Sequence, residues 1–186
     1  MEIGILKLGL FVVVTGGLLV ISRRGLRVPG SHGFYRFFAW EAILALVLVN
    51  SGAWFSDPLS AFQIVSWIFL MVSLFLLSQG LSLILRVGKP DVRRDDETLL
   101  TFEKTSVLIT AGLYRYVRHP LYSSLLFLAW GAFLKHPVWH SGCLVVVATM
   151  CLIATAKADE AECIRYFGPP YHEYMSRTKM FIPYLF

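Results

Sequence analysis

Residues 59–85 form the longest uncharged stretch of the sequence, LSAFQIVSWIFLMVSLFLLSQGLSLIL. A helix needs about 20 apolar residues to cross the hydrocarbon core of a bilayer. At 1.5 Å per residue, this stretch would be about 40 Å long. It therefore predicts a transmembrane helix that projects past the membrane.

Four further apolar stretches flank this one, at residues 3–21, 37–55, 120–134 and 138–156. The third of them has only 15 residues, so its helix would thin the bilayer locally or stop short of the far side. Together the five stretches predict an all-α integral membrane protein with five transmembrane helices. The alternative is four spans plus a re-entrant or buried hairpin.

The composition excludes several other classes of protein. Charged residues make up 16% of the chain, whereas soluble domains average about 25%, and the apolar share of 56% argues against disorder. The three cysteines form no CxxC pair, which disfavours a disulfide framework and a thiolate zinc site, and we expect no metal. The basic residues adjoin membrane segments, so anionic lipid head groups explain them better than nucleic acid does.

Positive charge orients the helices. Fifteen of the 17 lysines and arginines lie after the first, third or fifth stretch, leaving only Lys7 and Lys135 for the other side. Because cytoplasmic loops are enriched in basic residues, we predict an N-terminus outside and a cytoplasmic C-terminus. Residues 1–20 have no basic n-region, so we expect a retained helix rather than a signal peptide.

Isolated polar residues in or near the spans have simpler interpretations. Glu41 is an acid within the second stretch and is therefore a functional candidate, but it is close in sequence to Arg36, so we expect the two to pair. Four histidines show no metal-ligand spacing and are expected at the surface or the membrane interface: His32, His136, His140 and His172.

Two polar constellations are candidates for chemistry. In residues 110–122, Arg115, Arg118 and His119 precede Pro120, which is suited to the first position of a helix. That helix N-terminus would bind a carboxylate or phosphate, unless the segment is only a basic interfacial anchor. The second constellation comprises Asp159, Glu160 and Glu162, which could balance a cationic ligand, form a solvated helix face, or pair with Arg115 and Arg118.

At these constellations the sequence strongly resembles the isoprenylcysteine carboxyl methyltransferase family and the related phospholipid N-methyltransferases, as a compact prokaryotic member. The matching elements are LITAGLYRYVRHPLY at residues 108–122, the acidic pair at 159–160, FGPPYHEY at 167–174 and a closing Ile182-Pro183. They span about 40% of the chain. The order of the elements is specific, whereas Arg-His-Pro alone would be weak.

The resemblance implies an enzyme that uses S-adenosylmethionine at the cytoplasmic membrane interface. It divides the chain into three N-terminal transmembrane helices (1–87) and a catalytic core (88–186), in which the connection between spans three and four and the C-terminal extension form the cofactor region. The cofactor-binding positions that it implies are Leu108, Ile109, Gly112, Tyr114, His119, Pro120, Leu121, Tyr122, Asp159 and Glu160.

The resemblance also implies the reaction. Glu160, Lys157 and His119 would be the catalytic residues, and the product would be a methyl ester on a prenylcysteine α-carboxylate. The family places an arginine just before the acidic pair, where this chain reads Ala154-Thr-Ala-Lys157; a lysine is a point charge rather than a bidentate fork. The alternatives are a phospholipid amine N-methyltransferase, an NADPH-dependent sterol-type reductase, and a non-catalytic membrane protein.

Overall fold

The structure is a computed structural model that describes residues 2–89, 99–100 and 103–185. In this part of the chain the regular structure is helical, which confirms the all-α part of the predicted fold class; an isolated parallel bridge joins Val117 and Lys179. The long helices are α1 (Glu2–Leu26), α2 (His32–Asn50), α3 (Ala61–Val87), α4 (Pro120–Leu134) and α5 (Trp139–Phe167), and the shorter ones are η1 (Ser51–Ala53), η3 (Gly112–Arg115) and α6 (Pro169–Arg177).

Local sequence signals explain where several helices begin and end. The hydroxyls of Ser31 and Ser60 accept hydrogen bonds from backbone N–H groups in the first turns of α2 and α3. Helix α4 has Pro120 at its start, as predicted. Helix α5 continues past its apolar part and ends before Gly168, whose φ of +65° breaks the helix and lets α6 begin at Pro169.

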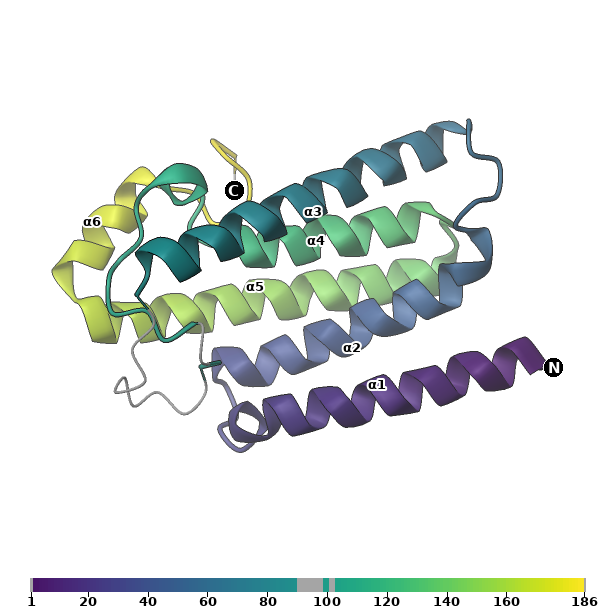
Figure 1. The fold of residues 1–186 in the computed structure, drawn as a ribbon, viewed down its shortest axis with the longest axis horizontal. Coiled ribbons are helices and arrows are strands. Elements are labelled where there is room, and N and C mark those ends of the chain that lie inside the picture. Colours follow the sequence, from purple (N-terminus) through teal and green to yellow (C-terminus); the bar gives the residue numbers. More distant parts are fainter. Residues whose placement is uncertain (1, 90–98, 101–102, 186) are drawn as a thin grey trace.

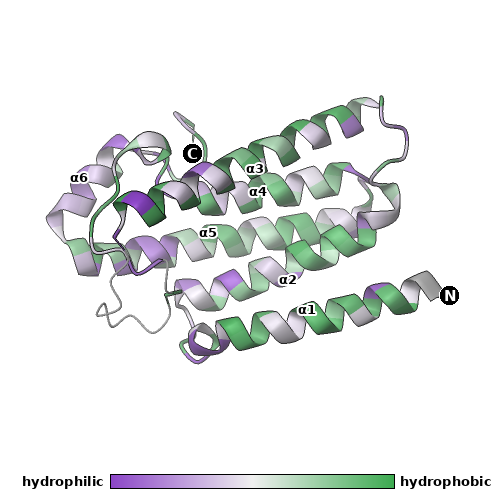
Figure 2. Ribbon diagram, viewed as in Figure 1, coloured by the Kyte–Doolittle hydropathy of each residue, from purple (hydrophilic) through white to green (hydrophobic). Residues whose placement is uncertain are grey.

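The five long helices lie side by side, and their hydropathy is high along most of their length (Figures 1 and 2). Helix α1 packs against α2, α2 packs against α5, and α3 packs against α4. The core between α2, α4 and α5 is rich in fully buried small residues: Ala39, Ala129, Ala132, Ala148 and Ala156. Helix α6, η3 and the C-terminal segment gather at one end of the bundle, opposite the N-terminus (Figure 1).

Helices α3 and α4 are joined through short side chains. The hydroxyls of Ser66 and Ser73 donate to the carbonyls of Gly131 and Ser124, both at 2.7 Å. A Cβ atom at Gly131 would lie only 3.0 Å from Leu70. Small residues and buried hydroxyls of this kind allow close contact between helices in a membrane.

Four of the helical segments are long and apolar enough to cross a membrane: Gly4–Leu26, His32–Ala53, Ala61–Val87 and Trp139–Phe167. These describe a multi-pass membrane protein. Helix α4 has the predicted bounds but only 15 residues, so a fifth span, like the orientation and the division after residue 87, stays a prediction.

Two of the expectations for polar residues are wrong. Glu41 accepts a hydrogen bond from Thr15 at 2.8 Å, whereas Arg36 binds Glu103. Residues five apart on a helix are rotated by about 500°, so Arg36 and Glu41 do not share a face. His32 is fully buried rather than superficial; the other three histidines are exposed, as expected: His136, His140 and His172.

The predicted orientation can be tested by cysteine labelling. His136 lies exposed in the α4–α5 connection, and His172 lies exposed on α6 at the other end of the bundle. In a variant with all three native cysteines changed to serine, we expect an impermeant maleimide to label His136→Cys on intact cells. We expect it to label His172→Cys only after permeabilisation; the reverse pattern would contradict the topology.

Candidate active site

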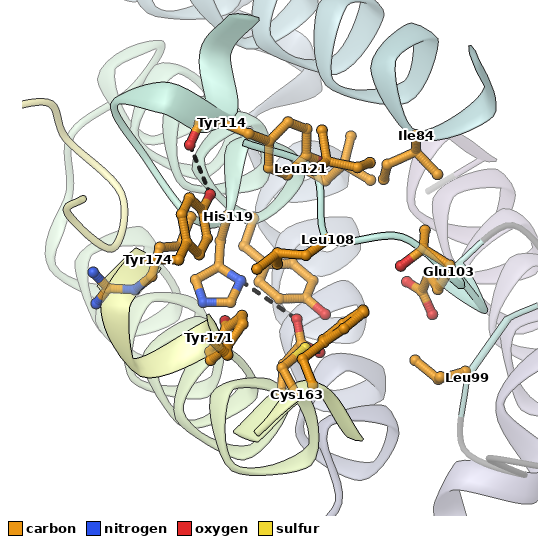
Figure 3. Close-up of a pocket in the computed structure, with 16 residues that line it drawn as sticks. Ile84, Leu99, Glu103, Leu108, Tyr114, His119, Leu121, Cys163, Tyr171 and Tyr174 are labelled. Carbon is orange, nitrogen blue, oxygen red and sulfur yellow. Dashed lines mark hydrogen bonds and ion pairs between the residues drawn. The ribbon is translucent and has the colours of Figure 1, made fainter. Parts of the chain in front are cut away.

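A single cavity accounts for most of the predicted site residues. It lies at the α6 end of the bundle, between the end of α3, the segment that precedes α4, the first turn of α4, the end of α5, and α6 (Figure 3). Its walls are largely aromatic and aliphatic: Ile84, Leu99, Leu108, Ile109, Tyr114, Leu121, Tyr122, Phe167, Tyr171 and Tyr174. The charged residues that line it are Glu103, Arg118, His119 and Asp159.

The C-terminal segment holds the start of α4 in place. The backbone N–H groups of Arg118 and His119 donate to the carbonyls of Lys179 (2.8 Å) and Met180 (3.2 Å). The hydroxyl of Ser123, one turn into α4, donates to the carbonyl of Phe181 at 2.8 Å. Residues 178–182 therefore fix the position of the Arg-His-Pro motif from outside its own element.

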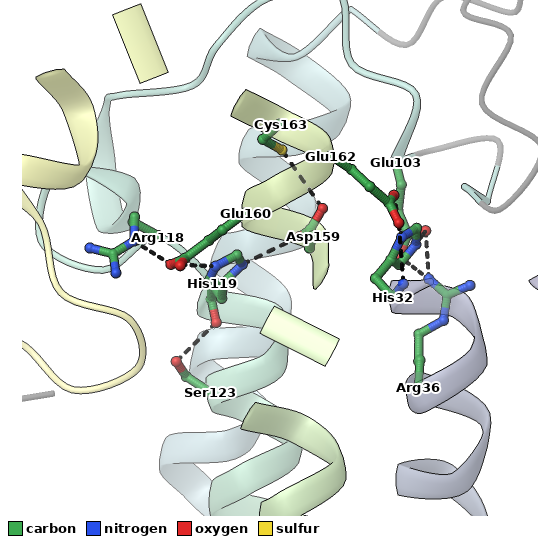
Figure 4. A network of polar contacts seen from close by, with 10 residues as sticks. All are labelled: His32, Arg36, Glu103, Arg118, His119, Ser123, Asp159, Glu160, Glu162 and Cys163. Carbon is green, nitrogen blue, oxygen red and sulfur yellow. Dashed lines mark hydrogen bonds and ion pairs between the residues drawn. The ribbon is translucent and has the colours of Figure 1, made fainter. Parts of the chain in front are cut away.

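His119 lies between the two acids of α5. Its Nδ1 is 3.4 Å from an Asp159 oxygen, and its Nε2 is 3.3 Å from a Glu160 oxygen (Figure 4). The imidazole also stacks on Tyr122, with ring centroids 5.3 Å apart. Because adjacent residues on a helix are about 100° apart, Asp159 and Glu160 reach the same ring from different sides.

Asp159 and Glu160 favour the charged form of His119. Burial alone would lower the pKa of the imidazole, but Asp159 and Glu160 outweigh burial and raise this pKa above its ordinary value. The phenols of Tyr114, Tyr171 and Tyr174 stay neutral instead, because burial raises the pKa of each. The cavity thus combines neutral aromatic walls with an imidazolium and a carboxylate.

Arg118 connects the acids to α6 and the C-terminal segment. Its Nε donates to Glu160 at 2.6 Å, and its Nη1 donates to the backbone carbonyls of Met175 and Thr178. Both side chains of the Arg118–Glu160 pair are only 10% exposed. Tyr174 adds a second anchor for α6, because its hydroxyl donates to the carbonyl of Tyr114 at 2.7 Å.

Most of the cofactor-binding positions implied by the resemblance line the cavity: Leu108, Ile109, Tyr114, His119, Leu121, Tyr122 and Asp159. Three do not. Gly112 makes the turn into η3 with a φ of +59°, Pro120 begins α4, and Glu160 faces Arg118. Lys157 is exposed on α5 and does not line the cavity, and Arg115 is exposed as well.

A second polar cluster lies beside the cavity, and no sequence pattern predicted it. It joins the start of α2 to α5 and to the segment before α4 (Figure 4). His32 Nδ1 lies 2.6 Å from Glu162, and Arg36 Nη1 lies 2.5 Å and 2.6 Å from the two Glu103 oxygens. Glu103 also lines the cavity. No local spacing could reveal these pairs, because 130 and 67 residues separate the partners.

One group in this cluster has the composition of a metal site. His32, Asp159 and Glu162 offer ligand atoms that lie within 4.8 Å of one another. The short His32–Glu162 contact already pairs two of these three groups. A cation would therefore have to displace an existing ion pair.

Comparison with known proteins identifies the family. The model of the phospholipid methyltransferase family matches residues 68–168, more than half of the chain. Methanethiol S-methyltransferase 1 of Bradyrhizobium diazoefficiens is 34% identical over 77 residues, which are 40% of this chain and 26% of that protein. The aligned region thus spans about a quarter of the relative's length. No solved structure gives a significant match.

The matched region runs from within α3 through the Arg-His-Pro motif to the end of α5, and therefore contains both constellations of the cavity. The resemblance seen in the sequence is thereby confirmed, and both matches are to methyltransferases rather than to reductases or non-catalytic proteins. The chain belongs to the phospholipid methyltransferase family.

Proposed function

We propose that this protein is an S-adenosylmethionine-dependent methyltransferase that acts on a membrane-soluble acceptor. The observation that carries the proposal is the cavity, which brings His119 and Asp159 together beneath aromatic walls. Its lining lies largely within the region that matches a methyltransferase family.

The lining residues fit the chemical groups of the cofactor. The Asp159 carboxylate suits an α-ammonium group, and the His119 imidazolium at the start of α4 suits an α-carboxylate. The rings of Tyr114, Phe167 and Tyr171 offer flat apolar surface to adenine. When bound, S-adenosylmethionine would supply the methyl group as a sulfonium substituent.

The protein's own contribution would be positioning and exclusion of water. Burial raises the pKa of Tyr114 and Tyr171 and keeps both phenols neutral, and Asp159 and His119 contact each other at the wall of the cavity. An in-line methyl transfer needs the acceptor held beside the reacting methyl, and such alignment accelerates reactions without a covalent intermediate. Water excluded from an apolar cavity also strengthens the electrostatic contacts within it.

The first acceptor to test is a prenylcysteine α-carboxylate, the substrate class implied by the motifs. Arg118 and His119 are the basic residues among the described lining, and both already contact acids of α5. Lys157, which the sequence offered in place of the family's arginine, is exposed outside the cavity. A carboxylate acceptor would therefore share its cationic partners with Glu160 and Asp159.

A thiol is the second candidate acceptor, because the 34% identical relative is named for methanethiol S-methylation. The mostly apolar lining suits a small or lipid thiol as well as a prenyl group. An amine phospholipid is the third acceptor to include, because it is the class for which the matching family is named.

Binding and transfer assays test this proposal. We expect purified protein in mild detergent to bind S-adenosylhomocysteine with a micromolar Kd by calorimetry. We expect radiolabelled methyl groups to be transferred to one of three acceptors offered in parallel: a prenylcysteine analogue, a thiol, or an amine phospholipid. Absence of S-adenosylhomocysteine binding by a protein that remains folded would refute the methyltransferase proposal.

A further inference from the structure

The cavity has a second acid on the side away from the Arg-His-Pro motif. Asp159 comes from α5 and contacts His119, whereas Glu103 comes from the segment between α3 and α4. In Figure 3, Glu103 lies well apart from His119 and Tyr174, across the cavity. Among the described lining residues these are the two carboxylates, and they approach the cavity from different elements.

Two buried basic residues of α2 contact Glu103. Arg36, 2% exposed, contacts both carboxylate oxygens, and fully buried His32 lies 3.8 Å from one of them. The backbone N–H of Leu100 donates to the same carboxylate at 2.9 Å. Burial acts to raise the pKa of Glu103, but His32 and Arg36 lower it, so the group stays ionised.

The contacts of Glu103 do more than join α2 to the segment between α3 and α4. Glu162 pairs with His32 from α5 without lining the cavity. Glu103 lines it, and its two oxygens can accept more hydrogen bonds than Arg36 and Leu100 donate. An ionised carboxylate that is only 13% exposed attracts a cation more strongly than it would in water.

We propose that Glu103 recognises the sulfonium charge of the cofactor, and that Arg36 and His32 are positioning residues that hold its carboxylate. This inference rests on the proposed function. Asp159 and His119 would bind the amino-acid end of the ligand. A carboxylate across the cavity would therefore lie near a positive charge further along the ligand. The only cationic group there is the sulfonium, which S-adenosylhomocysteine lacks.

The test compares two ligands that differ in this one charge. Calorimetry on the full chain in detergent would give the Kd values of S-adenosylmethionine and S-adenosylhomocysteine for the wild type and for Glu103→Gln. We expect Glu103→Gln to weaken S-adenosylmethionine binding about tenfold and S-adenosylhomocysteine binding less than threefold, because only the former loses a charge–charge attraction. The matched control is Glu173→Gln, which removes the charge of an exposed glutamate of α6 that does not line the cavity and should leave the ratio of the two Kd values unchanged.

A purely structural role would give a different result. If Glu103 only held the segment between α3 and α4 in place, its replacement would weaken the binding of both ligands by the same factor. Either this result or unchanged binding of both ligands would overturn the inference. If Glu103→Gln does not fold, Arg36→Lys is the second variant. It keeps the positive charge but loses the Nη1 atom that contacts both carboxylate oxygens. A selective loss of S-adenosylmethionine affinity is again expected, and an equal loss for both ligands would overturn the inference. A wild type that binds neither ligand would instead refute the proposed function.

Discussion

Replacing Asp159 with asparagine is expected to weaken S-adenosylhomocysteine binding by about 100-fold, or about 3 kcal/mol. The substitution preserves shape but removes the carboxylate that lines the cavity and contacts His119. A charge-assisted hydrogen bond to a ligand ammonium contributes about 1.5–3 kcal/mol, and the loss of the His119 contact adds to it. Calorimetry with the purified variant measures the change in Kd.

Glu160→Gln is the matched comparison, because Glu160 is the next residue on the same helix and does not line the cavity. We expect it to reduce thermal stability through Arg118 while weakening ligand binding less than Asp159→Asn does. A larger loss of affinity for Glu160→Gln, in protein of unchanged stability, would show that Glu160 is the acid that contacts the cofactor.

Replacing Arg118 with methionine is expected to lower the free energy of unfolding by about 3 kcal/mol and to abolish measurable methyl transfer. Methionine keeps apolar bulk but leaves Glu160 buried without its 2.6 Å partner, and frees the carbonyls of Met175 and Thr178. Removing one member of a buried ion pair costs about 3–5 kcal/mol because an uncompensated charge remains. Detergent-induced unfolding followed by tryptophan fluorescence measures the stability.

Arg177→Met provides the control for this variant. Arg177 also pairs with a glutamate, Glu173, but both side chains are mainly exposed, at 74% and 64%. Exposed pairs contribute at most about 1 kcal/mol, so we expect nearly unchanged stability and activity. Equal destabilisation by the two substitutions would mean that Arg118 does not act through its buried contacts.

The helices and their order could be predicted because each depends on local properties. Apolar stretches long enough to span a bilayer, Pro120 at the start of α4 and Gly168 at the end of α5 are visible in the sequence itself. The helix ends shifted where polar residues extend an apolar core: α2 begins at His32 rather than 37, and α1 continues to Leu26 rather than 21. Hydropathy locates the part of a helix that lies in lipid and not the whole helix.

Site residues could be predicted when they belong to one motif or one helix, but contacts between elements could not. The motif at 108–122 and the acids of α5 do meet at the cavity, but helix spacing alone could not decide which of Asp159 and Glu160 lines it. That choice depends on how α5 is rotated against α4. Glu103 and its partners on α2 were missed for the same reason, because their proximity is a product of tertiary packing.

The backbone pairing of residues 116–119 with residues 178–180 has a consequence for biosynthesis. The Arg-His-Pro motif leaves the ribosome about 60 residues before the segment that fixes it. Helices α1, α2 and α3 precede the motif in the chain and can enter the membrane before the pairing segment has been made. Assembly of the cavity must wait until residue 181 has been synthesised and has returned to the start of α4, so insertion of these three helices and completion of the site are separate events in time.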